Sequence, residues 1–273
     1  MMLQSQKIAF IGGGVMGEAM LKGLLGKQLI PAEQITVSDP HQERGDQLIE
    51  QYHVRFTLNN LEASRDADIV VLSVKPQVMG ELFQELKGNL KPDALIISIA
   101  AGMKLKTIQQ GCETPLVARA MPNTPGQIGE GMTVWTCTSG LTEDDRARVE
   151  AVLEALGLTL YVHQERFMDM ATALNGSGPS YVFLLMEAMI DAGVHMGFSR
   201  QDAQMLVHQT MLGSVKYAIQ SGNHPAELRN QVTSPGGTSA AALYQLEKGS
   251  VRTIISKAIW AAYNRSVELG QDD

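Results

Sequence analysis

The sequence has few cysteines, fewer basic than acidic residues and no long apolar run, and each of these shortages excludes a class of protein. Two cysteines in 273 residues, Cys112 and Cys137, cannot build a disulfide framework, so we expect reduced thiols and a cytoplasmic protein. Lysine and arginine number 22 against 29 aspartates and glutamates, which argues against a nucleic-acid partner because such partners require basic stripes. No apolar run reaches the roughly eighteen residues of a membrane span, and the N-terminus lacks signal-peptide character.

The remaining composition, 44% hydrophobic and 19% charged, is that of a globular chain, and the length fits about two domains of roughly 150 residues. Residues 1–165 alternate short apolar runs with amphipathic segments, which predicts a parallel sheet covered by helices on both faces. Strands are expected at 8–11, 35–38, 69–74, 95–99, 116–118, 133–136 and 158–162. Thr142 is the expected cap of a helix over 143–156.

The pattern changes near residue 165, after which no segment is a convincing strand. Helices are expected at 167–174, 181–196, 199–220, 225–232, 239–247 and 251–269. Pro179 is expected to break or kink the chain between the first two of these helices. This part is rich in alanine and methionine, which suits either an ordinary helical core or helices that bury apolar surface against a second subunit. We therefore predict an α/β domain over 1–165 and an all-α domain over 166–273.

A glycine-rich turn follows the first expected strand directly and opens a helix. Gly-x-Gly-x-x-Gly in this context is the dinucleotide-binding pattern of a Rossmann-type, doubly wound sheet, in which the helix amides hold a diphosphate. Its residues are Gly12, Gly13, Gly14, Val15, Met16 and Gly17. Asp39 lies 22 residues beyond Gly17, where a carboxylate would bind the ribose hydroxyls of NAD and repel a 2′-phosphate; the nearest arginine is Arg44.

Further polar segments follow other strands and open one late helix. Lys75 and the two-proline segment Arg119–Pro125 are expected at the carboxyl ends of parallel strands, where doubly wound folds bind ligands. The segment 233–239 combines hydroxyls with the amides of a helix N-terminus, which suits a carboxylate. The six histidines show no metal-ligand spacing, so no metal is expected.

Six ordered stretches identify the chain as similar to the pyrroline-5-carboxylate reductase family over nearly its whole length. They are Phe10–Gly17, Val74–Pro76, Ser98–Gly102, Arg119–Pro125, Gly176–Tyr181 and Leu228–Glu247. The resemblance implies a Rossmann domain followed by a helical domain that forms a homodimer, and in many members a ring of dimers. It also implies reduction of L-1-pyrroline-5-carboxylate by NADPH or NADH, the last step of proline biosynthesis.

The resemblance also implies roles for individual residues. Around the cofactor, beside the glycine loop and Asp39, it places Ser38, Pro40, Asn60, Ser73, Lys75, Pro76 and Ala101. Near the substrate it places Glu165, Gly236, Gly237, Thr238 and Ser239. The family usually has threonine where this chain has Ser239, so the catalytic hydroxyl is either that of Ser239 or that of Thr238.

Two other functions are compatible with a glycine loop followed by a helical domain. A β-hydroxyacid dehydrogenase would need a catalytic lysine after a glycine-rich stretch of the second domain, and Lys216 lacks that context. A non-catalytic nucleotide sensor gives no reason for the hydroxyl-rich segment 233–239. Neither alternative explains all six stretches.

Overall fold

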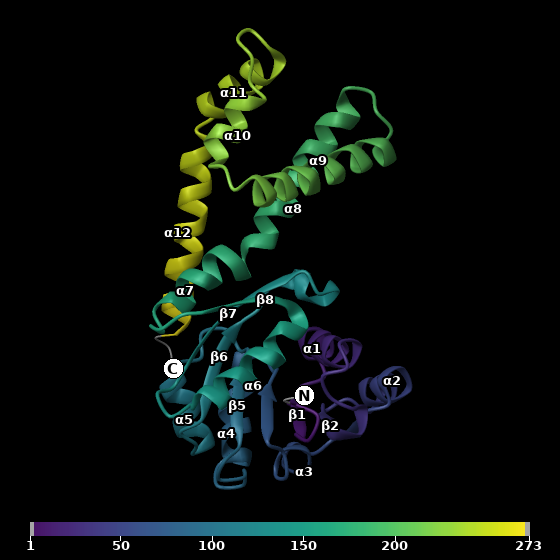
Figure 1. The fold of residues 1–273 in the computed structure, drawn as a ribbon, viewed down its shortest axis with the longest axis vertical. Helices are drawn as coiled ribbons and strands as arrows, with labels where there is room; N and C mark the ends of the chain where they lie inside the picture. Colours follow the sequence, from purple (N-terminus) through teal and green to yellow (C-terminus); the bar gives the residue numbers. More distant parts are fainter. Residues whose placement is uncertain (1–2, 271–273) are drawn as a thin grey trace. The chain divides into compact units, whose positions relative to one another are not determined.

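The computed structural model describes residues 3–270. The first part of the chain forms an eight-stranded sheet in the order β3-β2-β1-β4-β5-β6-β7-β8 (Figure 1). The strands are β1 (Ile8–Ile11), β2 (Ile35–Ser38), β3 (Arg55–Thr57), β4 (Ile69–Leu72), β5 (Leu95–Ser98), β6 (Val117–Met121), β7 (Gly131–Cys137) and β8 (Gly157–Tyr161). The six strands from β3 to β6 run parallel, so their carboxyl ends form one edge, and the strand order reverses between β1 and β4.

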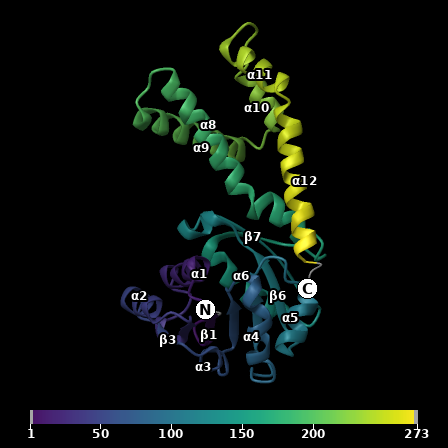
Figure 2. The same ribbon diagram turned by 180° about the vertical axis from the view of Figure 1, so that it is seen from behind.

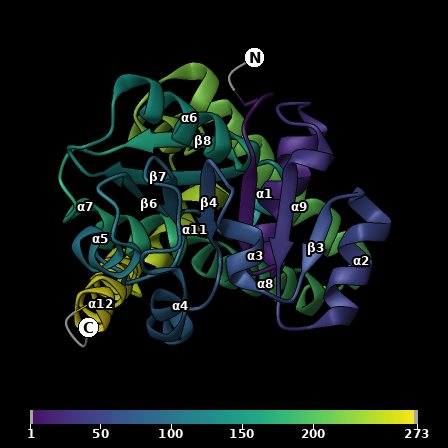
Figure 3. The ribbon, with the colours of Figure 1, turned by 90° about the horizontal axis from the view of Figure 1, so that it is seen from below.

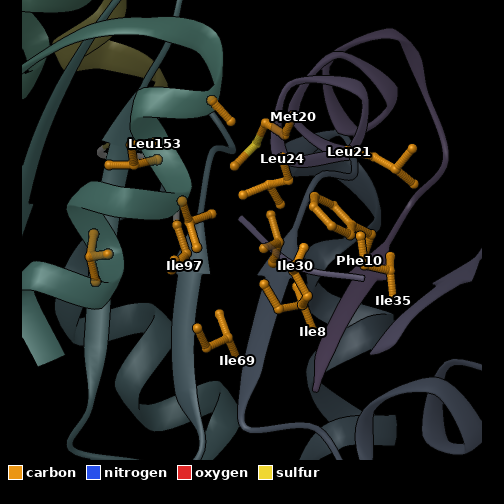
Figure 4. Packing of buried hydrophobic residues seen from close by; sticks show 14 of the residues in the cluster. Ile8, Phe10, Met20, Leu21, Leu24, Ile30, Ile35, Ile69, Ile97 and Leu153 are labelled. Carbon is orange, nitrogen blue, oxygen red and sulfur yellow. The ribbon is translucent and has the colours of Figure 1, made fainter. Parts of the chain in front are cut away.

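Helices cover both faces of the sheet because the inner strands are apolar on both sides. Ile8 and Phe10 of β1 pack with α1 and α6 on one face, whereas Ala9 and Ile11 pack with α3, α4 and α5 on the other (Figures 3 and 4). These helices are α1 (Val15–Gly26), α2 (Gln42–Tyr52), α3 (Asn60–Ser64), α4 (Met79–Leu86), α5 (Leu105–Cys112) and α6 (Glu143–Leu153). Short 3-10 turns lie at η1 (Ala32–Gln34), η2 (Pro76–Val78), η3 (Thr124–Ile128) and η4 (Glu154–Leu156). The doubly wound α/β prediction is confirmed.

The structure corrects three local predictions. The short strand β3 had not been expected, and β7 pairs antiparallel with β6. Arg119 lies inside β6 and not in a loop after it, because its backbone pairs with Ser98 and Thr136. The break or kink expected near Pro179 is present: α7 (Phe167–Ala171) and the π-helical turn η5 (Thr172–Gly176) end at a bend at Ser177, after which α8 (Gly178–His195) begins. Proline is tolerated there because it occupies the first turn of α8.

The helical part of the chain continues with four helices, as predicted from its residue periodicity. They are α9 (Arg200–Ser221), α10 (Pro225–Gln231), α11 (Thr238–Lys248) and α12 (Val251–Leu269) (Figure 2). Helices α8 and α9 pack through a small core of Ile190, Ala203 and Val207. No helix among the described residues is long and apolar enough to cross a membrane.

The chain forms two compact units whose limits differ from the sequence division at 165. One unit runs to Pro179 and takes up the chain again from Ala262, and the other is Ser180–Ala261. The first unit therefore contains the sheet together with α7 and the end of α12. A division of the chain into domains at residues 165 and 166 stays a prediction.

Candidate functional site

The glycine loop lies at the point where the strand order reverses, and each glycine of the fingerprint has a separate geometric reason. Gly12 has φ of +101°, and a Cβ on it would lie 2.8 Å from the Ser73 carbonyl oxygen. A Cβ on Gly17 would lie 2.6 Å from the Gly12 carbonyl oxygen, so this glycine lets α1 approach the loop closely. A Cβ on Gly14 would meet no protein atom within 4 Å, so space is open beside its backbone.

Helix α1 begins directly at this open space. Gly14 is its N-cap, no side chain caps it, and Val15 is largely exposed. The first-turn amides, which form the positive end of the helix dipole, therefore have no side-chain acceptor at the cap. Backbone amides beside an unobstructed glycine fit the diphosphate of a dinucleotide.

Asp39, at the end of β2, is tied to the glycine loop. Its Oδ2 accepts the Gly13 amide at 3.0 Å, and its Oδ1 accepts the His41 amide at 3.1 Å and lies 2.9 Å from His41 Nδ1. Oδ2 keeps a second lone pair for a ligand hydroxyl. Pro40 separates Asp39 from His41 and starts the turn into α2.

A second charged group binds the same loop, and the sequence analysis did not assign it a role. Arg44 donates from Nε to the Gly13 carbonyl oxygen at 2.7 Å and from Nη2 to the carboxylate of Glu18. The Tyr52 hydroxyl donates to the other Glu18 oxygen at 2.8 Å. Partial burial would raise the pKa of Glu18, but the bonds from Arg44 and Tyr52 and the arginine charge outweigh this and lower it.

The remaining residues predicted around the cofactor lie at or after the carboxyl ends of β2, β3, β4 and β5. Ser38 is buried and donates its hydroxyl to Asn60 Oδ1 at 2.8 Å, and Asn60 Nδ2 donates to Glu85 at 2.8 Å. Ser73 donates its hydroxyl to the Gly12 carbonyl oxygen at 2.7 Å, which fixes the loop. Lys75 and Ala101 are exposed, and Pro76 is half-buried at the start of η2.

Glu165 lies in an ion cluster of the first unit in which Arg119 is buried and the carboxylates are partly exposed. Its Oε1 accepts Arg119 Nη1 at 2.9 Å and the Leu105 amide at 2.7 Å. Arg119 is 4% exposed, and its Nη2 lies 3.7 Å from Asp169 Oδ1, which also accepts the Ser266 hydroxyl at 2.8 Å. Both Glu165 contacts use Oε1, so Oε2 is left for a ligand or water. The cluster joins β6, the start of α7 and the end of α12.

The hydroxyl-rich segment forms the N-terminus of α11 in the second unit. Gly237 is the N-cap, no side chain caps the helix, and Gly236 has φ of +73°. A Cβ on Gly237 would lie 2.5 Å from Ser234 Oγ, which would have to rotate away, and the positive φ of Gly236 favours glycine in this turn. Thr238 is exposed, and Ser239 is half-buried in the first turn. Amides and hydroxyls at one uncapped helix end can receive a carboxylate. Within residues 3–270, no group of three or more His, Cys, Asp or Glu side chains could hold a metal ion.

Two family models match the chain. The model for pyrroline-5-carboxylate reductase dimerisation covers residues 165–269, and that for NADP oxidoreductase, coenzyme F420-dependent, covers residues 7–102. Among curated proteins, a pyrroline-5-carboxylate reductase of Synechocystis sp. is 41% identical over 98% of this chain and 99% of its own length. The same-named protein of Pseudomonas aeruginosa is 40% identical over 98% of each chain.

Solved structures give the same grouping. Pyrroline carboxylate reductase of Plasmodium falciparum with NADP bound matches with a TM-score of 0.89 and 32% identity, over 98% of this chain and 99% of that one. The Coxiella burnetii pyrroline-5-carboxylate reductase has a TM-score of 0.87 and 34% identity, over 97% and 99%. The Mycobacterium tuberculosis 3-hydroxyisobutyrate dehydrogenase reaches a TM-score of 0.50 at 17% identity, over 86% of this chain and 71% of its own, which shows a shared fold alone.

Proposed function

Since this chain belongs to the pyrroline-5-carboxylate reductase family, we propose that it reduces L-1-pyrroline-5-carboxylate to L-proline with NADPH or NADH. The observation that carries the proposal is the pairing of full-length similarity with an unobstructed, uncapped glycine loop at the strand-order switch point. A β-hydroxyacid dehydrogenase would require a catalytic lysine after a glycine-rich stretch. Lys216 is an exposed residue of α9, and no glycine-rich stretch precedes it. A nucleotide sensor would give no reason for the helical part of the chain to be similar to that of reductases.

The cofactor role is assigned to the loop and to the strand ends beside it. The amides of the first turn of α1 would hold the diphosphate, and Asp39 would accept a ribose hydroxyl at its free Oδ2 lone pair. The other predicted lining residues are Ser38, Pro40, Asn60, Ser73, Lys75, Pro76 and Ala101. When bound, the dihydronicotinamide supplies a hydride to C5 of the ring.

The substrate role is assigned to the segment 236–239. Its amides would hold the substrate carboxylate and fix the ring, and the hydroxyl of Ser239 or Thr238 would hydrogen-bond the ring nitrogen. The substrate nitrogen is a cyclic imine that becomes an amine, so a proton must reach it when the imine arrives neutral. That hydroxyl can pass on a proton from water. Serine keeps the donor of the more usual threonine but loses the rotamer restriction of a β-branched side chain.

Glu165 is proposed to act at the substrate side through Oε2, with Oε1 anchored on Arg119 and the Leu105 amide. A carboxylate fixed at one oxygen is a pre-oriented acceptor at the other. This role differs from that of the amides at 236–239, which bind negative charge.

The assembly is proposed to be a homodimer through the helical part. Large apolar side chains are exposed along these helices in the isolated chain, including Leu184, Leu206, Ile219 and Trp260. Apolar side chains that gather on an exposed surface mark protein–protein interfaces. We further propose that the dimers assemble into a ring and that the protein is cytoplasmic, with reduced thiols.

The proposal is tested by NAD(P)H oxidation with pyrroline-5-carboxylate. The wild type should oxidise either nucleotide only when the substrate is present, and the T238A/S239A double variant should lose at least about tenfold in kcat/KM, as for a lost transition-state hydrogen bond. Absence of oxidation by the wild type overturns the enzyme function. Full activity of the double variant overturns the hydroxyl role alone.

A further inference from the structure

Arg44 is the arginine nearest in sequence to the end of β2, and each of its three side-chain nitrogens has a partner. Nε binds the Gly13 carbonyl oxygen, Nη1 lies 3.2 Å from Gln47 Oε1, and Nη2 pairs with Glu18. The arginine and the Glu18 carboxylate are each about a quarter exposed. The guanidinium is therefore fixed beside the glycine loop by contacts on each of its nitrogens.

This arginine and Asp39 share one residue of the loop. Asp39 accepts the amide of Gly13 and Arg44 donates to its carbonyl, so the two side chains flank the same peptide segment. In doubly wound dinucleotide sites, an acidic residue after the second strand meets the ribose 2′-hydroxyl, and a nearby arginine accommodates a 2′-phosphate. Here the acidic residue is present and the arginine is already paired.

Glu18 holds that pairing. It lies in the first turn of α1, where the helix dipole favours a negative charge, and Tyr52 binds its second oxygen. Burial, and then the same contact with Glu18, raises the pKa of Tyr52 to about 12, so the phenol stays a donor at neutral pH. A 2′-phosphate would meet the Asp39 and Glu18 carboxylates and an arginine whose charge Glu18 already neutralises.

We propose that Glu18 is a specificity-determining residue that withholds Arg44 from a 2′-phosphate, and that this chain consequently prefers NADH over NADPH. The inference rests on the proposed cofactor site but not on the identity of the imine substrate. The network around Gly13 consists of the four side chains of residues 18, 39, 44 and 52. It therefore links α1, the end of β2 and α2. Glu18 acts through Arg44 and is a positioning residue.

The test compares the binding of ADP-ribose and 2′-phospho-ADP-ribose by titration calorimetry. Both probes lack the nicotinamide, so the readout does not depend on turnover. The wild type should bind ADP-ribose more tightly. E18Q should shift the affinity ratio about tenfold toward the phosphorylated probe, which corresponds to about 1.4 kcal/mol, because Arg44 gains a phosphate partner. Y52F should shift it in the same direction by a smaller factor, which supplies a second variant if E18Q folds poorly.

Two control variants separate a freed arginine from a simple loss of negative charge. E43Q removes an equal charge from an exposed position next to Arg44 in α2 and should change the ratio less than about twofold. E18Q/R44Q should lose the shift that E18Q produces. An unchanged ratio in E18Q, an equal shift in E43Q, a shift that survives in E18Q/R44Q, or a wild type that prefers the phosphorylated probe overturns the proposal. Binding of neither probe overturns the cofactor site as well, whereas failure to reduce the imine leaves the ratio measurement valid.

Discussion

Alanine at Gly14 and alanine at Gly17 should have opposite consequences, although both glycines belong to one turn. The Gly17 Cβ would lie 2.6 Å from the Gly12 carbonyl oxygen and 2.9 Å from Ser73 Oγ, so the backbone must shift. Such overpacking costs about 1–3 kcal/mol of unfolding free energy, or roughly 2–4 °C of Tm per kcal/mol in a chain of this size.

The Gly14 Cβ would meet no protein atom within 4 Å, and its φ of −67° suits alanine. G14A should therefore leave Tm within about 4 °C, since Gly to Ala changes at compatible sites alter stability by under about 1 kcal/mol. The same Cβ would occupy the space proposed for the diphosphate, so the Kd for ADP-ribose should rise at least about tenfold. Displacing a backbone amide from a phosphate loses a charge-assisted hydrogen bond.

The assay is thermal unfolding together with calorimetric titration of each variant. G26A is the matched control, because its Cβ also meets no atom within 4 Å and lies at the far end of α1. G26A should keep wild-type ADP-ribose affinity. The reasoning is refuted if G14A binds ADP-ribose as the wild type does, or if G17A unfolds at the wild-type temperature.

Three further outcomes follow from other parts of the structure. R119M should lower the unfolding free energy by about 2 kcal/mol in urea titrations, because it removes a charged hydrogen bond to Glu165 and an ion pair with Asp169; a loss no greater than that of the exposed variant R65M would contradict the cluster's role. Burial would raise the pKa of Asp145, but the Thr142 bonds and Arg148 lower it below 3.8, so its stabilisation is complete above pH 3.8 and is lost as pH falls through the lower folded value. In D145N the unfolding free energy should fall less steeply as pH is lowered in the acid range than in the wild type. An unchanged slope would contradict this. Burial raises the pKa of the Cys112 thiol to about 12, so iodoacetamide and mass spectrometry should find native protein modified at half-buried Cys137 before Cys112, and the reverse order would contradict the packing.

The sequence was most informative where the signal is local. The turn from Gly12 to Gly17, the cap at Thr142 and the helix over 251–269 depend on neighbours in the chain, and the structure confirms all three. The Thr142 cap extends to a reciprocal capping box with Asp145.

Contacts between distant segments could not be predicted in the same way. Glu18 meets Arg44 across 26 positions, and Arg119 meets Glu165 across 46, so no periodicity or spacing reports them. The placement of Arg119 inside β6 depends on pairing with β5 and β7, which a short apolar run does not reveal. The roles of Thr238, Ser239 and Glu165 stay predictions.

The central claim is tested most directly by following the transferred hydrogen. NADH carrying deuterium at C4 on the transferred face should give proline with one deuterium at C5, in a one-to-one ratio with oxidised nucleotide, when the wild type acts on pyrroline-5-carboxylate. NMR of the isolated proline measures both the position and the ratio. Proline without deuterium at C5, or nucleotide oxidation without proline, would contradict the account.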